Sequence, residues 1–268
     1  MVKSSSLSPA TVRNVALPTE HGGWMFLIEP ILLGLGLSFS IPGLFLALAA
    51  SAVFLLRQPL KILVDDLRRR KRFARTGIAI RFSIAYGAAA LVFGVLAAAT
   101  ADIRFVIPLL MATPLVILQL WFDFGKRSRD LAAELSGSVA MGAIAPAIAL
   151  MSSWKLADAL FLWLILIARF IPAIIYVRQR LRLEYGKTTQ VWPVFLTHVI
   201  ALVAVGAMVI VLHAPWIPMI ALLLLLGRAA YGLSRWRIPA RPQAVGIQET
   251  VFGICTVIIY LAGYLAAR

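Results

Sequence analysis

The stretch of sequence that decides the fold is ADALFLWLILIARFIPAIIYV, residues 157–177. Only Asp158 and Arg169 carry a charge in it. An α-helix rises about 1.5 Å per residue, so roughly 20 mostly apolar residues cross the hydrocarbon core of a bilayer. The stretch therefore predicts a membrane-spanning helix.

The composition of the whole chain predicts an integral membrane protein. The 268 residues are 62% hydrophobic and 14% charged, whereas a soluble domain is roughly 45–50% apolar and about 25% charged. A net charge of +15 would indicate nucleic acid in a soluble protein, but in a membrane protein the basic loop residues set the topology. We therefore expect no nucleic-acid partner. The single cysteine, Cys255, excludes a disulfide framework within one chain.

Apolar runs broken by charge, proline and glycine predict nine spans in an all-α fold, and the second and eighth of these are short. The predicted spans are 24–40, 42–56, 78–99, 105–122, 131–152, 157–177, 191–212, 216–231 and 248–267. Residues 19–268 then form a single transmembrane helical domain, and residues 1–18 form a polar N-terminal tail.

The placement of charge orients these spans. Alternate connections fall on the same side, and all but three of the 26 basic residues lie on, or toward, the side of the N-terminal tail. The exceptions are Arg104, Lys155 and Arg268. Cytoplasmic loops carry the excess of Lys and Arg. We therefore expect the N-terminus in the cytoplasm and the C-terminus outside.

The first group of candidate site residues follows the second span. In a helix, Arg57, Lys61 and Asp65 repeat at i, i+4 and i+8 and share one stripe. Arg57 and Lys61 are candidates for binding an anionic group. The alternative is a solvated helix end whose cations meet anionic lipid headgroups, and we favour that interpretation for the basic run at 68–72.

The second group begins the fifth span, where Asp130 and Glu134 stand at i and i+4. Two carboxylates on one helix face repel each other unless a helix N-terminus, a cation or a divalent metal compensates. They are candidate metal ligands or catalytic bases. The alternative is a capping cluster that pairs with Lys126 and Arg127.

The third group lies on the sixth span and just after it. Arg169 falls inside the span, and a charge there costs at least ~2.5 kcal/mol by insertion scales, which makes it a functional candidate. Arg178 follows at the end of the span. The alternative for Arg169 is that it snorkels to the membrane interface.

The fourth group consists of polar residues in or beside other spans. Glu29 lies inside the first span and needs a partner there, and His21 lies at the entry to that span. His198 lies about two turns into the seventh span. A lone histidine at such a position is more often an interfacial polar residue than a ligand.

All four groups fall toward the predicted cytoplasmic side. Their convergence predicts one polar cavity that opens to the cytoplasm. Its predicted lining residues are Glu29, Arg57, Lys61, Asp130, Glu134, Arg169 and Arg178.

Three segments of the chain resemble the YwiC-like family of bacterial membrane proteins, and the resemblance runs over most of the chain. These segments are Glu20-His21-Gly22-Gly23-Trp24, Arg57-Gln58-Pro59-Leu60 and Ala168-Arg169 with Tyr176-Val177-Arg178. The resemblance implies a bacterial cytoplasmic membrane protein, without implying an activity.

A more distant resemblance is to the UbiA superfamily of intramembrane prenyltransferases, in which N-D-x-x-D-x-x-x-D follows span two and D-x-x-x-D follows span four. In that superfamily the carboxylates hold Mg²⁺, which binds the diphosphate of an isoprenoid donor. On the first motif this chain has Arg57, Gln58 and Lys61 at the first three motif positions, and only Asp65 is retained. On the second motif, Asp130 and Glu134 fit with one conservative change.

The UbiA resemblance implies a transferase with a phosphate-bearing lipid donor. Arg57, Lys61, Arg169 and Arg178 would hold the anionic group, because Arg binds phosphate directly in a bidentate manner. Asp130 and Glu134 would hold Mg²⁺ or act as bases, with Asp65 as a further acidic residue. Glu29, His21 and His198 would line the substrate site. The alternative is a non-catalytic carrier or accessory protein that binds a membrane lipid on the same scaffold.

Overall fold

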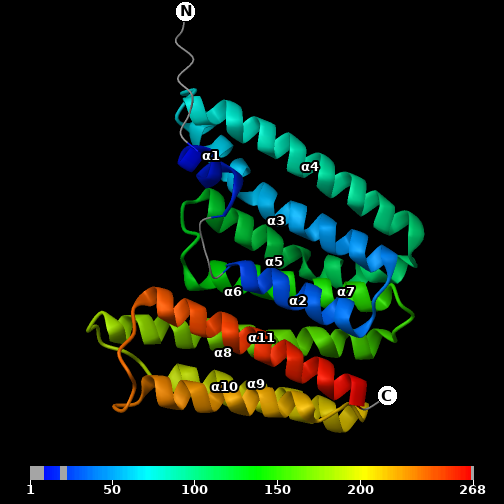
Figure 1. Cartoon of the computed structure of the whole chain (residues 1–268), viewed down its shortest axis with the longest axis vertical. Coiled ribbons are helices and arrows are strands. Elements are labelled where there is room, and N and C mark those ends of the chain that lie inside the picture. The colour runs from blue at the N-terminus through cyan, green and yellow to red at the C-terminus, as the bar shows by residue number, and fades with distance from the viewer. Residues whose placement is uncertain (1–8, 19–22, 267–268) are drawn as a thin grey trace, which may run out of the picture.

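The structure is a computed structural model that describes residues 9–18 and 23–266 (Figure 1). Over these residues it consists of helices and connecting loops, without a strand, as predicted. The helices in chain order are α1 (Pro9–Ala16), α2 (Gly23–Leu37), α3 (Ile41–Arg68), α4 (Ala74–Thr100), the 3₁₀ turn η1 (Ile103–Phe105), α5 (Val106–Phe124), α6 (Leu131–Gly142), α7 (Ile144–Leu150), α8 (Leu156–Glu184), α9 (Trp192–Leu212), α10 (Ile217–Leu233) and α11 (Pro242–Ala266).

The helices account for the predicted spans. Seven of the helical segments in the described part of the chain are long and apolar enough to cross a membrane. The helices α2 and α10 are apolar but shorter, with 15 and 17 residues. The count of nine is therefore approximate, and the class of polytopic α-helical membrane protein is confirmed.

The second span is longer than predicted. Ser40 caps α3 by accepting a hydrogen bond from the backbone N–H of Gly43 at 3.1 Å, and the helix then runs for 28 residues to Arg68. The prediction ended this span where the apolar run ends. The helix continues because a helical backbone tolerates polar side chains that find partners outside the apolar layer.

The fifth span is divided into α6 and α7. Pro146 has no backbone N–H, so the carbonyl group of Gly142 loses its usual helical donor. The chain makes a tight turn there instead, in which the N–H of Ala143 bonds to the carbonyl of Ala140 at 3.1 Å. All seven residues of α7 are buried.

The helices pack as a slab that has α4 at one edge and α9 and α10 at the other (Figure 1). Between these edges, α3 packs on α4, while α2 packs on α7 and α11, and α8 packs on α6, α7 and α9. The apolar core lies where α2, α7, α8 and α11 meet, around Leu33, Ile148, Leu166, Phe170 and Tyr260.

The N-terminal tail is partly helical. In α1 the side chains of Val15 and Ala16 are buried, and the helix packs on α3 and α4. The Tyr86 hydroxyl donates to the carbonyl of Ala16 at 3.2 Å, and the Gln58 amide donates to that of Asn14 at 3.1 Å. The tail is thus anchored to the bundle from residue 9 onward.

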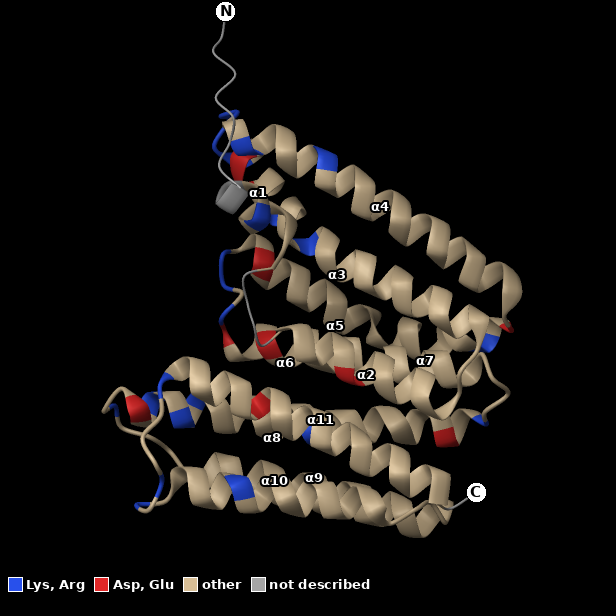
Figure 2. Ribbon diagram, viewed as in Figure 1, with Lys and Arg blue, Asp and Glu red and all other residues tan. Residues whose placement is uncertain are grey.

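Lys and Arg gather at one end of the slab (Figure 2). We call this the basic end. It is formed by the C-terminal ends of α3 and α8 and by the loops at 69–73, 125–130, 185–191 and 234–241. Arg104, in η1 after the end of α4, and Lys155, directly before the start of α8, lie at the opposite ends of those helices. Arg268 lies outside the described residues.

Candidate functional site

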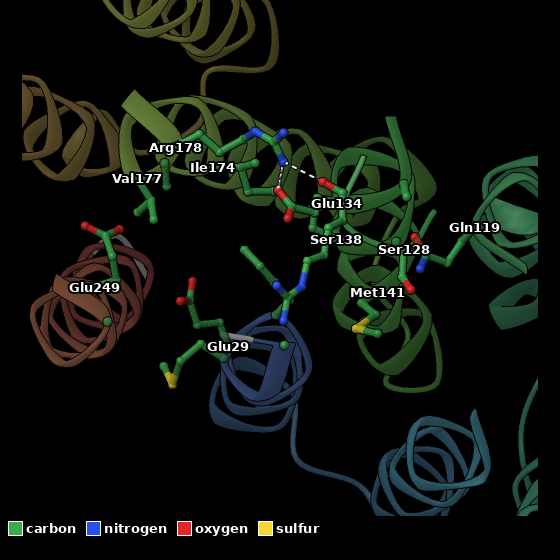
Figure 3. Close-up of a pocket in the computed structure, with 18 of the residues that line it drawn as sticks. Glu29, Gln119, Ser128, Glu134, Ser138, Met141, Ile174, Val177, Arg178 and Glu249 are labelled. Atoms are coloured by element: carbon green, nitrogen blue, oxygen red, sulfur yellow. Dashed lines mark hydrogen bonds and ion pairs between the residues drawn. The ribbon is translucent and has the colours of Figure 1, made fainter. Parts of the chain in front are cut away.

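A pocket of about 330 Å³ opens at the basic end between α2, α6, α8 and α11 (Figure 3). We call it the central pocket. Its polar lining residues include Glu29, Arg57, Arg129, Glu134, Arg169, Arg178 and Glu249. Its apolar lining residues include Met25, Phe26, Ala133, Met141, Ala173, Ile174, Val177 and Leu181. Five of the seven residues predicted to line one cavity therefore do so.

The deepest charges in the central pocket are those of Glu29 and Arg169. Arg169 Nη2 donates to Glu29 Oε1 at 3.1 Å and to the backbone carbonyl of Glu249 at 3.4 Å. The side chains of Arg169 and Glu29 are only 3% and 1% exposed. The two intramembrane charges that the sequence singled out are thus each other's partners. Arg169 points inward to a carboxylate, so it does not snorkel.

A glycine on α11 makes this arrangement possible. A Cβ atom at Gly253 would meet Glu29 Oε1 and would lie 3.1 Å from Arg169 Nη2. The pair therefore packs directly against the α11 backbone.

A second buried ion pair stands beside the first. Arg228 of α10 donates to both carboxylate oxygens of Glu249, at 2.6 Å to Oε2. Its guanidinium lies 4.2 Å from the ring centroid of Tyr176, within the range of a cation–π contact. Its side chain is 5% exposed. The deep part of the site therefore holds two carboxylates and two guanidinium groups in balance.

A more exposed ion pair stands at the mouth of the pocket. Arg178 Nη1 donates to Glu134 Oε2 at 2.7 Å and to the carbonyl of Arg129 at 2.9 Å (Figure 3). The side chains of Arg178 and Glu134 are 38% and 35% exposed. Solvent reaches both groups, unlike those of the deep pairs.

A cluster around Asp123 closes the side of the pocket toward α3. Arg57 contacts Asp123 through two nitrogens, with Nη2 2.8 Å from Oδ1. Lys61 Nζ lies 3.6 Å from the same carboxylate and donates to Ser128 Oγ at 3.0 Å. The Gln119 amide also donates to Asp123, at 3.2 Å. The Asp123 side chain is fully buried.

A second pocket, of about 430 Å³, adjoins the first at this cluster. We call it the cationic pocket. Its charged lining residues are Lys61, Arg68, Arg69, Arg75, Lys126, Asp65 and Asp123. Ser128 lines both pockets, while Arg57 lines the central one and Asp123 the cationic one. The cationic pocket carries five cations against two carboxylates.

The acidic residues of the UbiA-like motifs lie apart from the deep pairs. Asp65 lines the cationic pocket and pairs with Lys126 at 2.7 Å and Arg69 at 3.0 Å. Asp130 lines neither pocket and is 38% exposed, and it pairs with Arg127 at 2.6 Å. Of the pairs in the predicted capping cluster, the structure contains Asp130 with Arg127, whereas Lys126 pairs with Asp65 and Glu134 with Arg178.

Asp130 and Glu134 do not fit a magnesium site in this arrangement. An arginine holds one oxygen of each carboxylate, Asp130 Oδ2 by Arg127 and Glu134 Oε2 by Arg178, and these cations stand where Mg²⁺ would need oxygen ligands in octahedral geometry. In the part of the chain that the structure describes, no three His, Cys, Asp or Glu side chains come together as a metal site. The Mg²⁺ expectation therefore rests on the spacing of the two carboxylates and on the UbiA resemblance.

Of the two histidines predicted for the site, the structure describes only His198. His198 is buried on α9, its Nδ1 lies 2.7 Å from the carbonyl of Val194, and it lines neither pocket. Its position is that of a histidine bonded to its own helix. His21 lies outside the described residues.

Three charged residues at the site were missed from the sequence. Arg228 lies inside the eighth predicted span and Glu249 at the start of the ninth, so the argument that singled out Arg169 applies to both. Asp123 follows Trp121 and Phe122 at the end of the fourth span. Its position in the sequence is typical of an ordinary polar residue at a helix end. Only the packing of α3 against α5 reveals its role.

The fold and the pockets together define a polytopic α-helical membrane protein with paired charges deep in its bundle and excess cations at one end. The sequence model of a family described as YwiC-like protein matches residues 17–149, and the predicted resemblance to the YwiC-like family is confirmed over this stretch. Comparisons with curated proteins and with solved structures gave no match. The resemblance to the UbiA superfamily therefore remains a prediction.

Proposed function

We propose that the protein binds an amphiphile with a phosphate-bearing headgroup. The headgroup would occupy the cationic pocket and the apolar chain the central pocket. The observation that carries this proposal is the junction of the two pockets at Ser128. On one side of Ser128 the lining holds more cations than carboxylates, and on the other side it is largely apolar.

The chemistry of the cations supports this class of ligand. Lys61 presents N–H donors at the junction, and Arg68 presents them at the C-terminal end of α3 in the cationic pocket. Charge-assisted hydrogen bonds to phosphate are stronger than hydrogen bonds between neutral groups. Excess positive charge in a partly enclosed pocket also attracts anions from solution. An amphiphile with a cationic headgroup would meet repulsion from the same residues.

The test is binding of farnesyl diphosphate to the purified protein in nanodiscs, with farnesyl methyl ether as the uncharged probe. We expect Lys61→Ala to weaken diphosphate binding by about tenfold or more, because a hydrogen bond to a charged group contributes roughly 1.5–3 kcal/mol. Asp123 keeps its contact with Arg57 in this variant, so the fold is retained.

The matched control is Arg104→Ala, which removes a cation at the opposite end of the slab and should leave affinity unchanged. Equal affinity for the two farnesyl probes, or equal affinity of wild type and Lys61→Ala, would overturn the proposal.

Prenyl transfer is a second candidate within this proposal. It is favoured by Glu134, a carboxylate that lines the central pocket near the junction. Transfer would break the bond between the prenyl carbon and the diphosphate oxygen and form a bond from that carbon to the nucleophilic atom of a lipid acceptor. Glu134 would take the proton that the acceptor loses, and the cations would stabilise the departing diphosphate. Incubation of labelled farnesyl diphosphate with a membrane lipid extract tests it. A labelled product lost in Lys61→Ala supports transfer, and binding without a product supports a carrier or accessory protein.

We also propose that the basic end faces the cytoplasm of a bacterial inner membrane, since cytoplasmic loops carry the excess of Lys and Arg. Reporter fusions test this orientation. A periplasm-specific reporter attached to the C-terminus should be active, and a reporter attached within the loop at 234–241 should not be.

A further inference from the structure

Three buried polar atoms on the inner wall of the central pocket have no hydrogen-bond partner among the described residues. They are Glu29 Oε2 and the Nε and Nη1 atoms of Arg169. Both side chains line the pocket and are at most 3% exposed. Figure 3 shows Glu29 on α2 and Glu249 on α11 bordering the same part of the cavity.

Unpartnered atoms of this kind are costly, and a pocket occupant can remove the cost. A buried donor or acceptor left unsatisfied costs roughly 1–3 kcal/mol. The free atoms of Arg169 are donors only, and the free Glu29 oxygen is an acceptor only. The group that satisfies both must therefore accept one hydrogen bond and donate another.

The surrounding charges select a neutral group. Glu29 and Glu249 balance Arg169 and Arg228 in a buried environment, where any added net charge pays a large desolvation cost. An anion would face the lining carboxylates of Glu29 and Glu249, and a cation would face the guanidinium of Arg169, with that of Arg228 bound to Glu249. A hydroxyl group is neutral, donates once and accepts, and is small enough to sit beside the pair.

The side chains next to the Glu29–Arg169 pair favour an apolar chain on the ligand. Met25, Phe26, Ala173 and Ile174 line the pocket close in sequence to Glu29 and Arg169. These side chains offer dispersion contacts and no further hydrogen bonds. They suit an aliphatic chain rather than a polyol.

We propose that Glu29 and Arg169 form a subsite for the hydroxyl group of a neutral long-chain alcohol. The hydroxyl donates to Glu29 Oε2 and accepts from Arg169. This inference goes beyond the phosphate-bearing ligand, because it needs the central pocket and none of the cations of the cationic pocket.

The test uses a photoreactive n-dodecanol that carries a diazirine on its chain, with the protein in nanodiscs and the labelled peptides identified by mass spectrometry. We expect labels on α2 and α8 beside the pair. We expect n-dodecanol to compete about tenfold better than dodecyl methyl ether or dodecanoate, because the ether cannot donate and the acid is charged.

The decisive variant is the double substitution Glu29→Met with Arg169→Met. It removes both hydrogen-bonding groups and leaves no unpaired charge. We expect it to abolish the preference for the alcohol over the ether, because neither hydrogen-bonding group remains. The matched control is Glu134→Met with Arg178→Met, which deletes the same types of residue at the pocket mouth and should keep the preference.

Equal competition by the alcohol and the ether would overturn the inference, since water alone would then satisfy the pair. An alcohol preference that survives the double substitution would overturn it as well. If the double variant fails to fold, Gly253→Ala takes its place, because its methyl group displaces the Glu29 carboxylate. A failure of the phosphate proposal is seen separately, as diphosphate binding that does not depend on Lys61.

Discussion

The two pockets adjoin at Ser128 and differ in their charge. In the deep part of the central pocket, Glu29 and Glu249 are matched by Arg169 in the lining and by Arg228 beside it, and the Arg169 side chain is 3% exposed. In the cationic pocket five cations face two carboxylates, and the Arg69 side chain is 54% exposed.

This difference follows from depth. A charge removed from water is retained only when a partner of opposite sign compensates it, whereas water and counterions screen an exposed excess. On the proposed function, the basic end would hold a charged group and the deep part of the central pocket only neutral groups. An amphiphile with one charged end matches this gradient.

Breaking the deep pair on one side should have the largest effect on stability. Arg169→Met leaves the Glu29 carboxylate buried without its partner, and we expect a loss of about 3–5 kcal/mol in the free energy of unfolding. Unfolding by a denaturing detergent, followed by circular dichroism in mixed micelles, measures it.

The control for this prediction is Arg178→Met, which breaks an ion pair of the same type at the pocket mouth. Because that pair is more than a third exposed, we expect a loss below about 1 kcal/mol. The double substitution of Glu29 and Arg169 by Met should regain most of the lost stability. Equal losses in the two single variants would contradict the contrast in depth.

The next effect concerns the close approach of the α11 backbone to the Glu29–Arg169 pair. We expect Gly253→Ala to cost about 1–3 kcal/mol, because the added methyl group overlaps the buried Glu29 carboxylate. Gly87→Ala on α4 is the matched control, since nothing lies within 4 Å of a Cβ atom there. That variant should be neutral or slightly stabilising, because Ala is the better helix former. Similar losses in both would show that helix propensity, and not the pair, decides the outcome.

The individual charges of the deep pair could be predicted from the sequence, but their pairing could not. Arg169 and Glu29 stand out because an ionisable group inside an apolar run is costly. They are 140 positions apart, and no pattern in the chain indicates that α2 and α8 adjoin. The same limit applies to Arg57 and Asp123, which are 66 positions apart.

The helical fold was more predictable because apolar run length and charge placement are local properties. The spans were located on that basis. The error in α3 arose because the helix continues to Arg68, beyond the end of its apolar run. The predicted roles of Asp130 and Asp65 came from motif spacing. Spacing places a residue along a helix, but the neighbouring helices decide whether its side chain meets a pocket or solvent.

Ligand binding to the two pockets should depend differently on ionic strength. Raising the salt concentration from about 0.05 to about 0.5 M shortens the Debye length from roughly 14 to 4 Å. We expect it to weaken farnesyl diphosphate binding by about tenfold, because the cationic pocket acts partly through screened charge. Competition by n-dodecanol at the neutral subsite should change by less than about twofold. Titrations of both probes in one nanodisc preparation measure the ratio, and a parallel loss of both affinities would place the alcohol at the basic end.

The smallest effect is expected at Asp130. Its side chain is 38% exposed, its partner Arg127 is 66% exposed, and it lines neither pocket. Asp130→Asn should change stability by less than about 1 kcal/mol and farnesyl diphosphate binding by less than about twofold. Glu134→Gln is the matched comparison, because that carboxylate does line the central pocket and holds Arg178. If Asp130→Asn instead abolishes binding in the presence of Mg²⁺ and not in its absence, the two carboxylates act together as a metal site. In that case Arg127 and Arg178 must release them when the ligand arrives, and the basic end would work as the UbiA resemblance implies.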